Sequence, residues 1–292
     1  MRQTIAKMTP IPKQRREAKH DARHRQLPAL ALALALSLAG VRSFAEAPGH
    51  QPGAQEELRA AKLLETALFT RRSDAEEWRK LDRIYGDLSA RHPRDAAVKN
   101  GHAEFLWGIG ERSRAVETWE AAEAIDPRNA VVLDHLAGSH LAAGEAKKAA
   151  AYYARAVESA PQNAAYRFTF ANVTFLFRRE LLDATQPDEA TVLNKALGHF
   201  AEASRLDPLN PEYARAYAET FYSLPKPDWN AGLAAWQHFS EITPQKDFAQ
   251  ANLARVYLIL GQKDAARACL EKVQSAEFQR LKSRLSERIE ME

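Results

Sequence analysis

Two stretches, Ala122–Ala130 (AEAIDPRNA) and Ala156–Ala164 (AVESAPQNA), end in the same way and lie 34 residues apart. Each has a small residue, then a proline, and then an asparagine two positions after the proline. Proline cannot continue a helix because it lacks a backbone N–H, and asparagine is favoured at the N-cap of a following helix. Each stretch therefore predicts one helix that ends near the proline and another that begins directly after it.

The same signals recur along most of the chain. Prolines that end a helix are expected at Pro93, Pro127, Pro161, Pro208 and Pro244. The N-caps that follow are expected at Asp95, Asn129, Asn163 and Asn210, with Pro211 at the first helical position. Gly144 and Gly261 are expected to break each unit into two helices. A repeated helix pair buries its apolar face only by stacking on its neighbours, so the period predicts a solenoid.

Small residues recur in phase with these signals. They are Ala103, Ala115, Ala122, Ala137, Ala149, Ala156, Ala171, Ala196, Ala203, Ala218 and Ala254. A large side chain lies between the last two small residues of three units, at Trp119, Tyr153 and Phe200. We expect the small residues to let paired helices approach closely, and the rings to fill the space beside these contacts.

This pattern resembles the tetratricopeptide repeat, which has a 34-residue period. Ala137, Ala149, Tyr153, Ala156 and Pro161 match its small, aromatic and proline positions, and the preceding unit matches equally well. The resemblance implies an all-α solenoid of stacked antiparallel helix pairs over residues 56–274. About six pairs are expected, of which the first is degenerate because Leu81 and Leu88 stand where small residues belong.

Two segments depart from the period. Residues 178–190 (RRELLDATQPDEA) are an insertion, in which Leu181 and Leu182 are expected to extend a helix and residues 185–188 to cap the next one. The insertion is either a lengthened helix hairpin or a feature of the binding face. Residues 275–292 have apolar side chains at three- and four-residue spacing, which predicts an amphipathic capping helix, or alternatively a dimerisation helix.

The first 45 residues are typical of a secretory signal peptide. A basic stretch precedes Leu27–Val41, which is uncharged and shorter than the about 20 residues that span a bilayer. We expect cleavage after Ala45, a flexible mature N-terminus over residues 46–55 and no stable membrane insertion afterwards. The mature protein would be periplasmic in a bacterium with two membranes; a retained N-terminal anchor or secretion is the alternative.

Composition and motifs argue against several functions. Nine basic and two acidic residues fall in Met1–Ala45, so the rest of the chain has 32 basic and 36 acidic residues, unlike a nucleic-acid surface. His135 and His140 do not share a helix face, and no phosphate-binding loop occurs. Cys269 is expected to be a small packed residue.

We therefore expect no catalytic residues, cofactor or metal, and a scaffold or adaptor that binds protein. Self-assembly, or hydrolysis of envelope polymers at an unrecognised site, is the alternative.

The resemblance also implies where a partner would bind, because the first helices of tetratricopeptide units line a groove. The residues carried over to that groove are Asn100, Glu104, Trp107, Asp134, Phe168, Asn172, Phe175, Arg215, Glu219, Tyr222 and Arg255. Asp134, Phe168 and Arg215 replace the lysine and asparagine of the chaperone-type carboxylate clamp, so that clamp is absent. The rings among these residues suggest a protein or extended peptide partner held by ring faces. The alternative is that the rings pack between repeats.

Overall fold

The structure is a computed structural model that describes residues 53–70, 74–183 and 185–291. The predicted signal peptide, and all but the last three residues of the predicted flexible segment 46–55, lie outside these ranges; residues 54 and 55 already belong to the first described helix. No strand occurs in the part of the chain that the structure describes, and no helix there is both long and apolar enough to cross a membrane.

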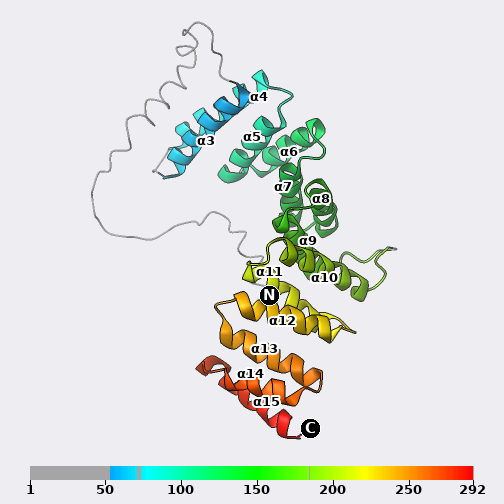
Figure 1. The fold of residues 1–292 in the computed structure, drawn as a ribbon. Helices are drawn as coiled ribbons and strands as arrows, with labels where there is room; N and C mark the ends of the chain where they lie inside the picture. The colour runs from blue at the N-terminus through cyan, green and yellow to red at the C-terminus, as the bar shows by residue number, and fades with distance from the viewer. Residues whose placement is uncertain (1–52, 71–73, 184, 292) are drawn as a thin grey trace, which may run out of the picture. The chain divides into compact units, whose positions relative to one another are not determined.

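The described residues form helix pairs that follow one another along the chain (Figure 1). They divide into two compact units, with the boundary between Pro127 and Arg128. The helices of the first unit are α3 (Ala54–Thr70), α4 (Ala75–Arg91), α5 (Ala96–Ile109) and α6 (Arg112–Ile125). The second unit begins with α7 (Ala130–Ala142), α8 (Ala146–Ser159), α9 (Ala164–Leu176), α10 (Glu189–Leu206) and α11 (Pro211–Thr220). It continues with η2 (Phe221–Ser223), α12 (Trp229–Ile242), α13 (Lys246–Ile259), α14 (Lys263–Glu271), η3 (Ala276–Phe278) and α15 (Gln279–Met291).

The helix ends follow the local signals in the sequence. The predicted N-caps are confirmed, because each side chain accepts a hydrogen bond from the backbone of its own helix: Asp95, Asn129, Asn163 and Asn210. Gly110, Gly144 and Gly261 lie at or just beyond the ends of α5, α7 and α13 with φ of 92°, 80° and 71°. Only glycine adopts this left-handed conformation readily, so these positions fix the turn between the helices of a pair.

The small residues of the repeat lie at the helix contacts. All eleven alanines predicted for these contacts have no exposed surface, and the three rings between them, Trp119, Tyr153 and Phe200, are at most 2 % exposed. The pairs from α5–α6 to α13–α14 contain these positions, whereas α3 and α4 contain none of them; the all-α architecture of helix pairs predicted from the repeat is confirmed.

The insertion at residues 178–190 differs from the prediction. Helix α9 ends at Leu176, so Leu181 lies in a turn beyond it, Leu182 lies in irregular structure, and the expected helix extension was wrong. The Asp183 carboxylate accepts hydrogen bonds from the backbone of Thr185 and Gln186, a local turn that competes with helix. The predicted cap is confirmed at Asp188, whose Oδ1 accepts from the backbone of Thr191 at 2.7 Å.

The C-terminal helix α15 covers the end of the second unit. It packs on α13 and α14 and buries Leu285 and Ile289 in the same cluster as Leu270 and Cys269. The predicted capping role is therefore confirmed. The segment begins with the 3₁₀ turn η3, so Phe278 precedes α15 and lies beside the start of α13 instead of continuing the α-helical stripe.

Candidate partner-binding face

In the first unit, the predicted groove residues Asn100 and Glu104 belong to one polar network. The Lys62 Nζ on α3 lies 2.9 Å from one Glu104 oxygen, and Asn100 donates to the other at 2.8 Å. The Trp119 indole on α6 donates to the Asn100 side-chain oxygen at 3.0 Å. The groups of this face are therefore largely engaged with one another.

Next to this network lies a second carboxylate, Glu65 of α3. The Tyr85 hydroxyl donates to it at 2.7 Å, and burial raises the pKa of Glu65 above its ordinary value although that hydrogen bond opposes the shift. Trp107, also predicted for the groove, is half-buried; the Arg112 guanidinium lies 3.8 Å from its ring centroid and the Trp119 ring lies 5.4 Å away.

In the second unit, the predicted groove residues on α7 and α9 lie in different surroundings. Asp134 is half-buried, and burial raises the pKa of its carboxyl. Asn172 is half-buried on α9. Phe168 packs between helices: its ring centroid lies 5.7 Å from that of Phe200 and 4.5 Å from that of Tyr213. Phe168 therefore follows the alternative in which rings pack between repeats, with part of its surface still accessible.

Phe175 does not belong to an accessible face. It is only 7 % exposed and packs with Ala171, Leu193, Ala196 and Phe200 in the contact between α9 and α10. Its placement in the groove is therefore corrected. Burial of this ring among apolar side chains is favourable.

The groove residues on α11 and α13 meet through arginine and ring contacts. Arg215 pairs with Glu219 at 2.8 Å, and its guanidinium lies 4.5 Å from the ring centroid of Phe248. Arg255 lies in the same way over Tyr222, at 4.4 Å. The two stacks contain three of the predicted groove residues, Arg215, Tyr222 and Arg255, and Glu219 joins them through its ion pair with Arg215.

Tyr222 is held by more than its stack with Arg255. It lies in η2, directly after α11, and its hydroxyl is 3.4 Å from both the backbone and the side-chain oxygen of Asn252. Arg255 donates to the same Asn252 side chain at 3.2 Å. Burial raises the pKa of Tyr222 to about 12, so its hydroxyl stays protonated and can donate.

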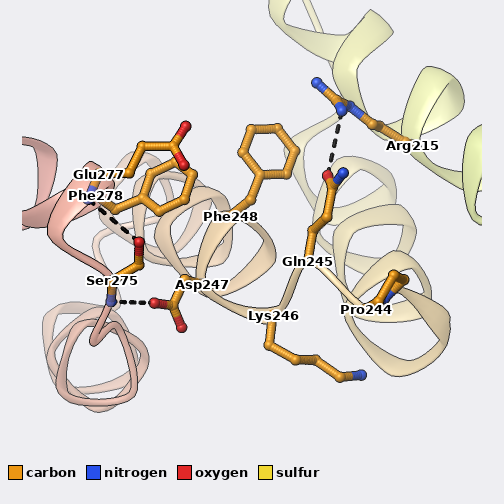
Figure 2. A pocket seen from close by; sticks show the side chains of 9 residues that line it. All are labelled: Arg215, Pro244, Gln245, Lys246, Asp247, Phe248, Ser275, Glu277 and Phe278. Carbon is orange, nitrogen blue, oxygen red and sulfur yellow. Dashed lines mark hydrogen bonds between the residues drawn. The ribbon is translucent and has the colours of Figure 1, made fainter. Parts of the chain in front are cut away.

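A hollow of about 560 Å³ opens beside Arg215 and Phe248 (Figure 2). Its other wall comes from η3, where the Phe278 ring centroid lies 6.1 Å from that of Phe248. Asp247 fixes this wall, because its carboxylate accepts hydrogen bonds from the backbone of Gln274 and Ser275. Phe278 was not predicted for this face, since its spacing in the sequence placed it on the capping helix.

A second hollow, of about 480 Å³, lies between α13 and α15. It is lined by Arg255, Leu281, Arg284, Leu285 and Arg288. Only Arg255 was among the residues predicted for partner binding. The signal that could have revealed the others is the spacing of Leu281, Arg284, Leu285 and Arg288, which places them on one side of a helix.

The described residues contain no group of three or more His, Cys, Asp or Glu side chains placed to hold a metal ion. Cys269 is buried, and burial raises the pKa of its thiol. The reactive thiolate is therefore disfavoured at this position.

Comparison with known proteins identifies the architecture. Residues 249–280, which contain most of α13 and all of α14, match the family model described as tetratricopeptide repeat. The structure is similar to the crystal structure of YrrB, described as a TPR protein with an unusual peptide-binding site. The TM-score is 0.54 and the identity 16 %, over 70 % of this chain and 97 % of that one. The fold is that of the tetratricopeptide repeat.

A second solved structure has the same tetratricopeptide fold. PilF of Pseudomonas aeruginosa aligns with a TM-score of 0.52 and 17 % identity, over 80 % of this chain and 100 % of that one. No curated protein matches the sequence. At these identities the likeness concerns the fold, and the tetratricopeptide resemblance predicted from the small residues and prolines is confirmed.

Proposed function

We propose that this protein is a non-catalytic scaffold that binds an extended segment of another protein along its first helices in the second unit. The observation that carries the proposal is the pair of arginine–ring stacks, Arg215 on Phe248 and Arg255 on Tyr222, beside two open hollows. Rings and guanidinium groups are the side chains that most often dominate binding energy at protein interfaces.

The geometry supports an extended segment as the ligand. Both stacks bridge α11 or η2 to α13, so they form a surface that crosses successive repeats instead of one closed cavity. Guanidinium groups held over rings are already ordered, and less side-chain entropy is then lost when a partner binds. YrrB, which shares the fold, is itself described as having a peptide-binding site.

We further propose that the scaffold acts outside the cytoplasm, in the periplasm of a bacterium with two membranes. The support is the basic stretch followed by Leu27–Val41 and the small residues up to Ala45. N-terminal sequencing of the exported protein should then find Glu46. Exported protein that begins at Met1 or Met8 would contradict cleavage.

Affinity capture from native envelope extract tests binding at this face. The full chain serves as bait, beside a variant in which the Arg215–Glu219 ion pair is removed by Arg215→Ala and Glu219→Ala. The matched control removes a similar ion pair on α10, the second helix of its pair. This ion pair joins Glu202 and Arg205, whose charged groups are 2.7 Å apart. Both pairs lie at the surface with part of their side chains in solvent, and surface pairs contribute about 1 kcal/mol or less to stability, so both variants should stay folded.

We expect the wild type and the Glu202/Arg205 control on α10 to capture the same partner. The Arg215/Glu219 variant on α11 should fail to capture it. Circular dichroism of all three proteins confirms that they are equally folded. Equal capture by all three would place binding away from the α11–α13 surface and contradict the proposed function.

A further inference from the structure

The hollow between α13 and α15 has an unusual charge for this chain. Three of its five lining side chains are arginines, Arg255, Arg284 and Arg288, and none is acidic. The chain outside Met1–Ala45 has more acidic than basic residues, so this concentration of positive charge is local. Such a site attracts a negatively charged ligand in preference to a neutral or positive one.

Two of these arginines, Arg255 and Arg284, keep donors available at the hollow. Arg255 is exposed and lies on the Tyr222 ring, with one hydrogen bond to Asn252. Across residues 53–70, 74–183 and 185–291, no carboxylate pairs with Arg255 or Arg284. A guanidinium presents five N–H donors in a planar fork, which matches the two oxygens of a carboxylate.

The floor between the arginines is apolar. Leu285 is only 5 % exposed and belongs to the core beneath α15, while Leu281 is half-buried against the same core. A small inorganic anion would leave this floor uncovered. A ligand with an apolar side chain next to a carboxylate would cover the leucines and pair with the arginines at once.

We propose that this hollow binds an acidic peptide segment of the partner protein, in which an aspartate or glutamate lies next to an aliphatic or aromatic side chain. The inference rests on the proposed scaffold function and specifies the chemistry of the partner. It gives α15 a second role, because the helix that covers the last repeat then also supplies two of the three arginines.

The position of Arg255 supports continuity with the rest of the face. Its guanidinium lines the hollow and also covers Tyr222, so one side chain joins the α13–α15 hollow to the stack on η2. A bound acidic segment would therefore extend from the hollow toward α11. The local patch is small and includes leucines, unlike the dense basic surface that nucleic acid requires.

Selection from a displayed library of random peptides on the full-length protein tests the proposal. The site variant combines Arg255→Gln with Arg284→Gln, which keeps side-chain polarity and removes two positive charges. The matched control is Arg280→Gln. Arg280 is an exposed arginine on α15, the helix of Arg284, and it does not line the hollow. Circular dichroism and mass in solution show whether each protein is folded and unchanged in size.

We expect the wild type and Arg280→Gln to enrich peptides with Asp or Glu beside an apolar residue, and the double variant to lose that enrichment. For a synthetic copy of an enriched peptide, fluorescence anisotropy should give a Kd at least about tenfold weaker in the double variant, since charge-assisted hydrogen bonds are lost. Binding by wild type should weaken as salt rises.

Several results would overturn the proposal. Acidic enrichment that persists in the double variant would place recognition elsewhere, and enrichment of basic or uncharged peptides would reverse the assigned chemistry. Displacement of the peptide by millimolar inorganic phosphate would identify a simple anion site, and dimerisation lost in the double variant would identify a second copy as the occupant. If capture from extract still depends on Arg215 and Glu219, the scaffold function stands although this inference fails.

Discussion

The first-helix faces of the two units are built on the same buried alanines but carry different chemistry. In the first unit, Lys62, Asn100 and Glu104 bond to one another, and Glu65 accepts from Tyr85. In the second unit, Arg215 and Arg255 lie on rings and line the two hollows, whereas Arg112, which lies on Trp107 in the first unit, lines neither of them. One face satisfies its polar groups internally, and the other offers donors to a ligand.

The difference shows that stacking and recognition use separate positions of the repeat. The alanines at the helix contacts are fully buried in both units, and a larger side chain added at these closely packed positions would be destabilising. The positions one turn away, such as Asn100 and Arg215, touch the contact only at its edge and can change without altering the fold. Four predictions test how far this separation holds, beginning with the largest effect.

Removing the large ring from either unit should destabilise it to a similar degree. Trp119 is 2 % exposed and Trp236 is fully buried, so Trp119→Ala and Trp236→Ala should each lower the free energy of unfolding by about 3–5 kcal/mol. Urea denaturation followed by circular dichroism measures this change, with the exposed Arg83→Ala as control. A loss below about 1 kcal/mol in either variant would show that its ring does not support the helix contact.

A smaller substitution, tryptophan to phenylalanine, should lower the stability of the two units by different amounts. The Trp119 indole donates to Asn100, whereas the Trp236 indole nitrogen is buried without a hydrogen-bond partner among the described residues. Trp119→Phe should therefore cost about 1 kcal/mol more than Trp236→Phe, since it leaves the Asn100 oxygen without its donor. The same urea denaturation gives both values. Equal losses would mean that water replaces the indole at Asn100.

Two buried groups, Glu65 in the first unit and His199 in the second, should respond to pH in opposite directions. Burial raises the pKa of Glu65 above 4.5, so the stability linked to this group is complete below pH 4.5 and is lost as pH rises through the folded-state value. Burial, with the charges of Arg167 and Lys195, lowers the pKa of His199 from 6.5 to about 4. Its contribution is present above pH 6.5 and is lost as pH falls toward 4.

Glu65→Gln and His199→Gln isolate these contributions. The difference in unfolding free energy between wild type and Glu65→Gln should change only on the alkaline side of pH 4.5, and that for His199→Gln only on the acid side of pH 6.5. A pH series of denaturation curves measures both differences. Variant curves parallel to the wild type would contradict the assigned environments.

The smallest effect concerns the arginines that lie on rings. Arg112→Ala removes the stack on Trp107, and Arg255→Ala removes the stack on Tyr222. Each should cost less than about 1 kcal/mol of stability, because exposed cation–π contacts are weak. Only Arg255→Ala should weaken capture of the partner. Equal loss of capture in both variants would assign binding to the first unit as well.

The sequence was sufficient for the features that depend on short-range chemistry. A proline, an N-cap and an alanine act on their own turn or on the facing helix, so the roles of Asn163, Ala149 and Gly144 could be predicted from the sequence alone. The helix contacts of the pairs after α3–α4 followed from these positions.

The candidate site was less predictable because it depends on the tilt of each helix toward its neighbours. Phe175 holds the same repeat position as Trp107 and Tyr222, yet it is buried in a cluster with Leu193, Ala196 and Phe200, whereas Trp107 and Tyr222 are half-buried. Arg284 has no counterpart in the repeat pattern, because it lies on the capping helix. Its place at a hollow follows only from the packing of α15 on α13.

Cys269 gives the protein an internal reporter of its own motion. It is the one cysteine of the sequence, it is buried, and it lies on α14 between α13 and α15. A thiol reagent can reach it only when these helices separate, so the labelling rate of the unmodified chain measures how often the last repeat opens. A ligand held by α13 and α15 would slow that labelling, and the same sulfur would then report binding without any attached probe.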